Sequence, residues 1–160
     1  MLSRTAGNLF WIGRYLERAD FSARLIEATQ RLAALPSSYG GASNAWESAL
    51  AAACQIDAFA ATGLAIDEHE VTEFLTLNAA NHSSIRSCLE SARSNARAVR
   101  TALTEEAWEA INTAWLEVSR YGTHLSNRET LAQLIEYVKH AVAAFDGAAN
   151  RTMLRGDQGA

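Results

Sequence analysis

The sequence has 160 residues, of which 49% are hydrophobic and 20% are charged, and this balance excludes an intrinsically disordered chain. Its formal net charge of −4 excludes a general electrostatic attraction to nucleic acid or to anionic membranes, which usually requires a basic surplus. This length suits one globular domain and proline occurs once, so we expect residues 1–160 to form a single helical domain.

The N-terminal region predicts one long helix that crosses the domain. It starts near Ser3 or Thr5, which can act as N-caps, and runs to about Leu35, where Pro36 and a Ser/Gly-rich stretch stop it. Helical spacing puts one set of apolar residues on a single face: Leu9, Ile12, Tyr15, Leu16, Ala19, Ala23 and Ile26.

The opposite side of this helix mixes charged and apolar residues. It carries Arg14, Glu17, Arg18, Asp20 and Arg24 together with Phe10, Phe21, Leu25 and Leu32. Because partly buried charges need partners, we expect Arg14 to pair with Glu17 and Asp20 to pair with Arg24, whose spacings allow contact.

Two shorter helices are expected next. Asn44 can cap a second helix that continues through Phe59 to about Gly63. Asp67 followed by Glu70 has the form of a capping box, and it predicts a short third helix that ends between residues 78 and 81.

The C-terminal half predicts three more helices. A fourth covers roughly residues 83–103, and Thr104 caps a fifth that frays near residue 121. Ser126, with Glu129 three residues later, forms a capping box for the last helix, which Gly147 either ends or bends. No strand-like alternation competes anywhere, so we predict an all-α fold, an antiparallel bundle of about six helices with a long N-terminal helix.

The first candidate site is the charged group on the N-terminal helix. Guanidinium groups of Arg14 and Arg18 could bind a phosphate or a carboxylate, with Glu17 orienting them. The alternative is an ion-pair network that ties this helix to its neighbours, and spacing alone favours the network.

The second candidate is an arginine stripe on the fourth helix. Its members, set around Glu90, are Arg86, Arg93, Arg97 and Arg100. The stripe could form an anion-binding wall that faces Glu17 and Arg18, or it could be a solvated helix face. Asn95 lies at the edge of the apolar stripe, where an amide more often satisfies a buried polar group than binds a substrate.

Other kinds of site find little support. His69 and Glu73 have metal-compatible spacing but lack a second histidine, and no glycine-rich phosphate loop is present, so we expect no metal and no cofactor. The cysteines Cys54 and Cys88 suit a reduced compartment, and the N-terminus lacks a signal peptide, which predicts a cytoplasmic protein. We expect the tryptophans to be core anchors: Trp11, Trp46, Trp108 and Trp115.

Several separated motifs resemble those of a known family. They lie, in order, at residues 1–6, 8–19, 81–85, 88–89, 92–100, 108–112 and 152–155. The sequence is similar to the bacterial alpha-E domain proteins, an all-helical family named for its Glu-Arg motif, which falls here on Glu17 and Arg18.

Two departures from the family accompany this resemblance. His82 stands where the family usually has proline, a minor change at a helix entry. Family members also usually run to about twice this length and carry a second Glu-Arg helix. The resemblance therefore implies the N-terminal half of the family domain, either as a truncated piece or as a natural half-module.

The resemblance also implies a setting for the protein. Members are typically encoded beside, or fused to, ATP-grasp-type ligases and transglutaminase-like proteins, which implies a role in a peptide-ligation or peptide-modification system. Our leading hypothesis is a non-catalytic helical accessory module that works with such a partner. Its candidate polar pocket comprises Arg14, Glu17, Arg18, Arg93, Asn95 and Arg97.

Two alternatives stay open. The chain could be an enzyme that uses Glu17 as acid or base in an arginine-lined pocket, or it could be a self-associating structural scaffold. A half-module whose first helix has two apolar sides should also pair with a second copy, so we expect a homodimer.

Overall fold

The computed structural model describes residues 2–36 and 41–156, with side-chain surroundings at 3–36 and 44–151. Within these ranges the chain forms α-helices, one short 3-10 helix and no strand, so the predicted all-α fold is confirmed. The elements are α1 (Leu2–Ala33), α2 (Gly41–Ala52), α3 (Ile56–Ala60), α4 (Glu68–Thr76), α5 (Ile85–Ala98), η2 (Arg100–Ala102), α6 (Glu105–Arg120) and α7 (Arg128–Gly156).

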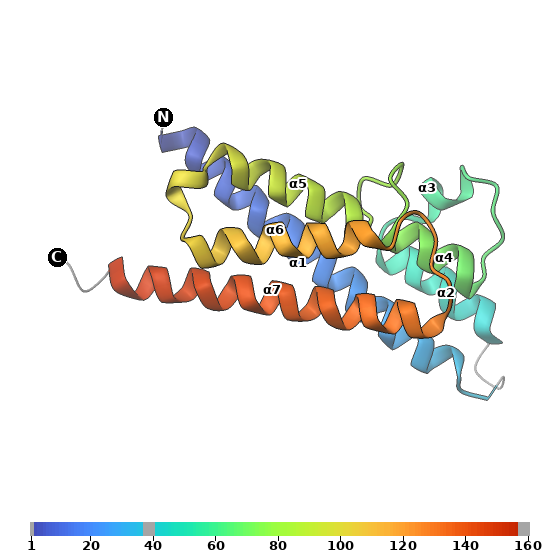
Figure 1. The fold of residues 1–160 in the computed structure, drawn as a ribbon. Helices are drawn as coiled ribbons and strands as arrows, with labels where there is room; N and C mark the ends of the chain where they lie inside the picture. Colours follow the sequence, from blue (N-terminus) through green and yellow to red (C-terminus); the bar gives the residue numbers. More distant parts are fainter. Residues whose placement is uncertain (1, 37–40, 157–160) are drawn as a thin grey trace.

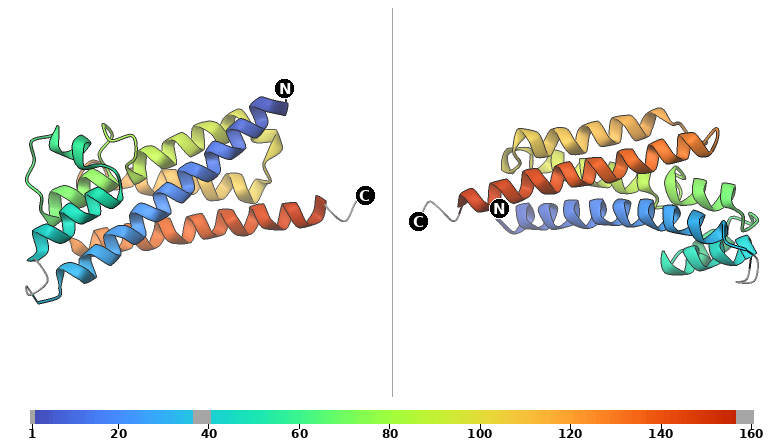
Figure 2. Two further views of the ribbon diagram at one scale, coloured as in Figure 1. Left: turned by 180° about the vertical axis from the view of Figure 1, so that it is seen from behind. Right: turned by 90° about the horizontal axis from the view of Figure 1, so that it is seen from below.

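The four longest helices form an antiparallel bundle. Helix α1 packs against α5 and α7, and α6 packs against the same two helices, so each has two neighbours that run in the opposite direction (Figure 1). The shorter α2, α3 and α4 gather beside the C-terminal end of α1, where the loop between α6 and α7 also lies (Figures 1 and 2). We call this region the bundle end.

Helix α1 buries most of the predicted face, but Leu9, which we expected on that face, is 39% exposed. Ile12, Leu16, Ala19, Ala23 and Ile26 are at most 3% exposed, because this face meets α5 and α7. The helix begins at Leu2 and ends at Ala33, so its start is earlier and its end slightly earlier than predicted. Ser3 and Thr5 lie inside the helix rather than at its N-cap.

The predicted second helix is two helices. Helix α2 ends at Ala52, and Cys54 then takes the left-handed conformation with φ 55°. Cys54 N donates to Ala51 O at 2.9 Å and Gln55 N donates to Leu50 O at 2.8 Å, which is the hydrogen-bond pattern of a Schellman motif. The chain therefore turns and begins α3 at Ile56, while Asn44, the predicted cap, lies inside α2.

Local capping signals fix the starts of α4, α5 and α6. Asp67 Oδ1 accepts a hydrogen bond from Glu70 N at 2.9 Å, as predicted. Thr104 Oγ1 accepts from Ala107 N at 3.2 Å, also as predicted. The cap of α5 is Ser84, and this helix ends at Ala98 rather than near residue 103, with η2 following it.

Helix α7 starts one residue later than the predicted capping box requires. Asn127 Oδ1 accepts a hydrogen bond from Thr130 N at 2.8 Å, so Asn127 is the cap and Ser126 is not. Gly147 lies inside α7, which continues to Gly156, so glycine does not end the helix here.

The tryptophans differ in burial. Trp46 is 1% exposed and belongs to the core, as predicted. Trp108 and Trp115 are only partly buried, because each lies at the surface of α6 with an arginine over its ring, Arg100 of η2 over Trp108 and Arg93 of α5 over Trp115. Trp11 is 47% exposed, so the prediction that it anchors the core is wrong.

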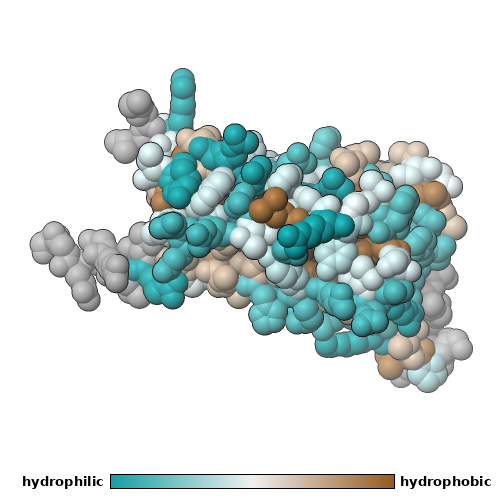
Figure 3. Space-filling view, viewed as in Figure 1, coloured by the Kyte–Doolittle hydropathy of each residue, from teal (hydrophilic) through white to brown (hydrophobic). Residues whose placement is uncertain are grey.

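The molecular surface is not uniform in polarity. The face made by α5, α6 and α7 in the view of Figure 1 is mostly hydrophilic, with small hydrophobic areas (Figure 3). Most of the large exposed apolar residues occur instead on α1 and around α3, and Leu116 is one on α6. None of the helices in the described part of the chain combines the length and the apolarity that a membrane crossing needs.

Candidate functional site

The Glu-Arg motif lies on α1, and its glutamate faces solvent. Arg14 Nη1 donates to Glu17 Oε2 at 3.2 Å, and the two side chains are 54% and 71% exposed. Arg24 Nε donates to Asp20 Oδ2 at 2.6 Å, so both predicted ion pairs are confirmed. Because water screens such pairs, each contributes little to stability.

Arg18, the other residue of the motif, is half-buried, and its positive charge acts on the Cys88 thiol of α5. Burial raises the pKa of the Cys88 thiol to about 11, while the charge of Arg18 acts in the opposite direction. The thiol is therefore protonated at neutral pH and behaves as a small core residue.

A group of carboxylates lies between α1 and α7. Burial raises the pKa of Asp146 above its ordinary value, and the negative charges of Asp20 and Glu17 raise it further. Asp20 Oδ1 is buried and makes no hydrogen bond. The surroundings of Glu17 thus include two other carboxylates as well as Arg14.

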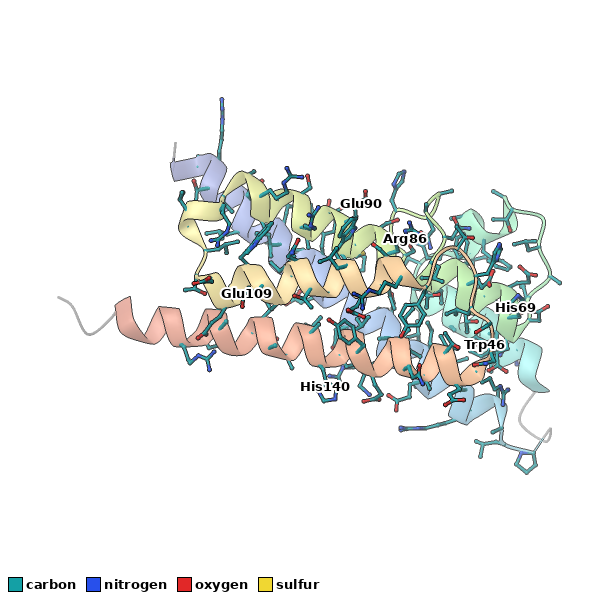
Figure 4. All side chains as sticks on the ribbon, viewed as in Figure 1. Trp46, His69, Arg86, Glu90, Glu109 and His140 are labelled. Carbon is teal, nitrogen blue, oxygen red and sulfur yellow. The ribbon has the colours of Figure 1, made fainter. Side chains whose placement is uncertain are left out.

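The arginine stripe of α5 is directed at α6 and at the loop that follows it. Arg93 Nε donates to Asn112 Oδ1 at 2.7 Å, and the Arg93 guanidinium lies 4.3 Å from the centroid of the Trp115 ring. Arg86 Nη1 donates to Gly122 O at 2.6 Å. Figure 4 labels Arg86 on α5, beside α6.

The structure does not join the two predicted groups of polar residues. Asn95 Nδ2 donates to Ser91 O of its own helix at 2.8 Å, and Arg97 is exposed. Among the described residues, no hydrogen bond or ion pair links Arg14, Glu17 or Arg18 with the three α5 residues. That these six residues bind a ligand stays a prediction.

The bundle end holds a cluster of charged residues that we did not predict as a site. Glu73, on α4, is central to it, because its side chain is only 14% exposed and both of its oxygens are used. Leu125 N donates to Glu73 Oε1 at 2.9 Å, and His124 Nδ1 lies 3.0 Å from Glu73 Oε2. His69 Nε2 lies 3.7 Å from Glu73 Oε1. Glu73 therefore fixes the loop between α6 and α7 to α4.

A second connection lies beside it. Gln30 Nε2 of α1 donates to Glu68 Oε1 at 3.0 Å, and Arg128, the first residue of α7, donates to Glu68 Oε2. Glu68 thus joins three helices at one point. Figure 4 labels His69 and Trp46 at this end of the molecule.

Three hollows surround these residues. One of about 280 Å³ is lined by Glu68, His69 and Arg128, among others. A second of about 290 Å³ shares Glu68 and Arg128 with the first, so the Glu68–Arg128 pair lies between them. A third of about 390 Å³ is lined by Leu64, Glu73 and His124 together with neighbouring residues.

The surface next to these hollows is apolar. Ile56, Leu64 and Ile66 are large hydrophobic residues that are at least 36% exposed. They belong to α3 and to the segment between α3 and α4. The bundle end therefore combines concave surface, charges of both signs and exposed apolar side chains.

The sequence contained only part of the signal for this cluster. His69 and Glu73 have the spacing that we noted, but His124 and Leu125 come from a loop about fifty positions away. In the ranges that the structure describes, no three or more His, Cys, Asp and Glu side chains could hold a metal ion. We interpret the cluster as a clamp in which Glu73 holds the loop between α6 and α7 by hydrogen bonds.

Comparison with known proteins gives one match. A family described as "a predicted alpha-helical domain with a conserved ER motif" matches residues 1–159. The sequence contains Glu-Arg once, at residues 17–18. The match covers nearly the whole chain, so the expectation that only an N-terminal half of the family domain is present is wrong. No significant match was found among curated proteins or among solved structures.

Proposed function

The chain belongs to the Alpha-E family, and on this basis we propose that it is a non-catalytic helical binding module of a peptide-ligation or peptide-modification system. Its partner is an ATP-grasp-type ligase or a transglutaminase-like protein, and it docks on the bundle end. The observation that carries the proposal is the combination at that end of three hollows, opposite charges, and exposed Ile56, Leu64 and Ile66.

The composition of this surface suits a protein partner. Specific interfaces have an apolar centre that loses water on binding and a polar rim that fixes orientation. Leu64 and Ile66 supply apolar area, and Arg128, His69 and His124 surround it with groups that are largely exposed. Loops that a rigid scaffold holds in place are common sites of recognition, and the Glu73 clamp holds such a loop here.

The surroundings of Glu17 support binding over catalysis. A general acid or base works best in a site that excludes water, where its proton transfer is well positioned. Glu17 is 71% exposed on the outer side of a helix and is paired with Arg14. The proposal therefore gives this chain no reaction of its own.

The test is a binding measurement with the ligase and the transglutaminase-like protein encoded nearest to this chain. We expect one of them to bind, and Leu64→Asp combined with Ile66→Asp to weaken binding by at least about tenfold, because a carboxylate in an apolar interface centre costs several kcal/mol. Leu116→Asp is the matched control, because Leu116 is 45% exposed but lies on α6. If Leu116→Asp weakens partner binding as much as the double variant does, the partner does not dock on the bundle end. If neither protein binds the wild type, the accessory role is contradicted.

A second experiment separates this proposal from the enzyme alternative. If the chain is an enzyme, Glu17→Gln abolishes turnover of the mixture while the fold and partner binding stay intact. If it is a binding module, the same variant leaves the turnover of the partner unchanged.

A cytoplasmic location stays a prediction.

A further inference from the structure

The outer side of α1 carries a stripe of four exposed residues. Phe10 and Phe21 are 60% and 47% exposed, and Arg14 and Glu17 lie between them. Steps of four, three and four positions keep all four residues on one helix face. This face is opposite the buried one, and α1 lies in front of the other helices when the molecule is seen from behind (Figure 2, left).

The stripe reads the same in both directions except for the sign of its charges. Phe10 and Phe21 are the outer members and Arg14 and Glu17 are the inner members, and both pairs are centred between Tyr15 and Leu16. Two identical helices that run antiparallel about a two-fold axis bring symmetric positions together. An axis at this centre places Phe10 opposite Phe21 and Arg14 opposite Glu17, twice in each pair of helices.

We propose that two copies of this chain pair through this stripe, with their α1 helices antiparallel and the two-fold axis between Tyr15 and Leu16. Each Arg14 then meets Glu17 of the second copy, and each Phe10 packs on Phe21 of the second copy. The occupant is a second copy because the stripe is complementary to itself in both charge and order.

The charges also select the orientation. Parallel helices in the same register put Arg14 against Arg14 and Glu17 against Glu17, and such like-charge contacts are unfavourable. Only the antiparallel arrangement places each Arg14 opposite a Glu17, so that all contacts between these charged residues are attractive. The next symmetric positions are Gly7 and Arg24, and a glycine with open space around its Cα leaves room for the arginine of the second copy.

The expected affinity is modest. Exposed ion pairs contribute about 0–1 kcal/mol each, so the charges fix register more than strength. The apolar contribution comes from four phenylalanine rings, and a single helix pair is a small interface. We therefore expect dimerisation in the micromolar range. This inference does not depend on the proposed function, because it uses α1 rather than the bundle end.

The main test is sedimentation of the full chain at concentrations up to about 1 mM, which covers weak self-association. We expect the wild type to form dimers, and Arg14→Glu or Glu17→Arg alone to weaken dimerisation by at least about tenfold, since each replaces two attractions with two repulsions. An equimolar mixture of the two variants should restore dimers, because each supplies the charge that the other lacks. The double variant should restore them as well.

The matched control is Arg120→Glu. Arg120 is exposed and pairs with Glu117 across one turn of α6, as Arg14 pairs with Glu17 on α1, but it lies on another helix. This variant should dimerise like the wild type. A wild type that stays monomeric at all concentrations, or single variants that dimerise normally, overturns the proposal.

Cross-linking tests the register directly. In a Cys54→Ser background, Phe10→Cys mixed with Phe21→Cys should form a disulfide-linked dimer. Either variant alone should not, because identical positions are then about 16 Å apart along the helix axis, well beyond the Cα separation that a disulfide allows. Cross-linking of Phe10→Cys alone, or a mixture in which no disulfide joins position 10 to position 21, overturns the antiparallel arrangement.

Discussion

Lys139 on α7 donates a hydrogen bond from Nζ to Glu27 Oε2 on α1 at 3.0 Å, and so joins two residues 112 positions apart. Lys139 also donates to Glu136 Oε1 at 2.6 Å. The hydrogen bond from Lys139 lowers the pKa of Glu27, and the hydrogen bonds to Glu136 and Glu27 raise the pKa of Lys139. The first and last helices of the bundle are therefore linked by charge as well as by packing.

Replacing Lys139 with methionine should lower the melting temperature at neutral pH by a few degrees. The pKa of Glu27 in the folded chain lies below its ordinary value of 4.5, so this link contributes fully above that pH and is lost as the pH falls through the lowered pKa. The difference in melting temperature between the wild type and the Lys139→Met variant should therefore become smaller at acidic pH. Thermal unfolding followed by circular dichroism at neutral and acidic pH measures it. Arg120→Met, at a pair within α6 that does not involve Glu27, is the control and should change less.

Leu89→Ala should destabilise the bundle by about 2–5 kcal/mol, because it removes a side chain from a filled core and leaves a cavity. Leu89 is 0% exposed on α5. Chemical denaturation gives the free energy of unfolding. Leu116→Ala, at a leucine that is 45% exposed, should stay within about 0.5 kcal/mol of the wild type. Equal effects at both positions contradict the observed packing.

Asn127→Ala should cost about 1 kcal/mol of unfolding free energy, since it removes the side chain that caps α7. Ser126→Ala should cost less, because Ser126 hydrogen-bonds the Thr130 side chain rather than a backbone N–H. Denaturation of the two variants decides between the observed cap and the one that the sequence suggested. A larger loss of unfolding free energy for Ser126→Ala than for Asn127→Ala would favour Ser126 as the cap of α7.

The two cysteines should differ sharply in reactivity. Cys54 is exposed and Cys88 is buried, with the pKa of its thiol raised to about 11. A thiol reagent at neutral pH should label one site in the folded chain and two after denaturation. Cys54→Ser should abolish the fast labelling, and persistent fast labelling in that variant contradicts the burial of Cys88.

Local signals in the sequence predicted the starts of α4 and α6. Asp67 and Thr104 cap their helices as expected, because a cap depends on residues within one turn. The α2–α3 turn escaped prediction because Cys54 occupies a left-handed position that usually carries glycine. Ser126 and Asn127 are adjacent residues of equal capping ability, and their sequence does not distinguish them.

The candidate site was harder to predict, because periodicity assigns a residue to a face but not to a neighbour. Arg93 lies on the polar side of α5, as expected, yet it packs on Trp115 of α6 instead of facing α1. The Glu73 clamp joins positions about fifty residues apart, and a local sequence pattern does not predict such a contact. The palindromic order on α1 is visible in the sequence, but its exposure is known only from the structure.

The bundle end lies at the C-terminal end of α1, far from the N-terminus (Figure 1). Antiparallel pairing of two α1 helices therefore directs the two bundle ends away from each other. The proposed dimer would carry one bundle end at each side, so it would be able to connect two partner molecules. Binding to an immobilised, densely spaced partner should then gain strength through avidity, which a monomeric Arg14→Glu variant lacks.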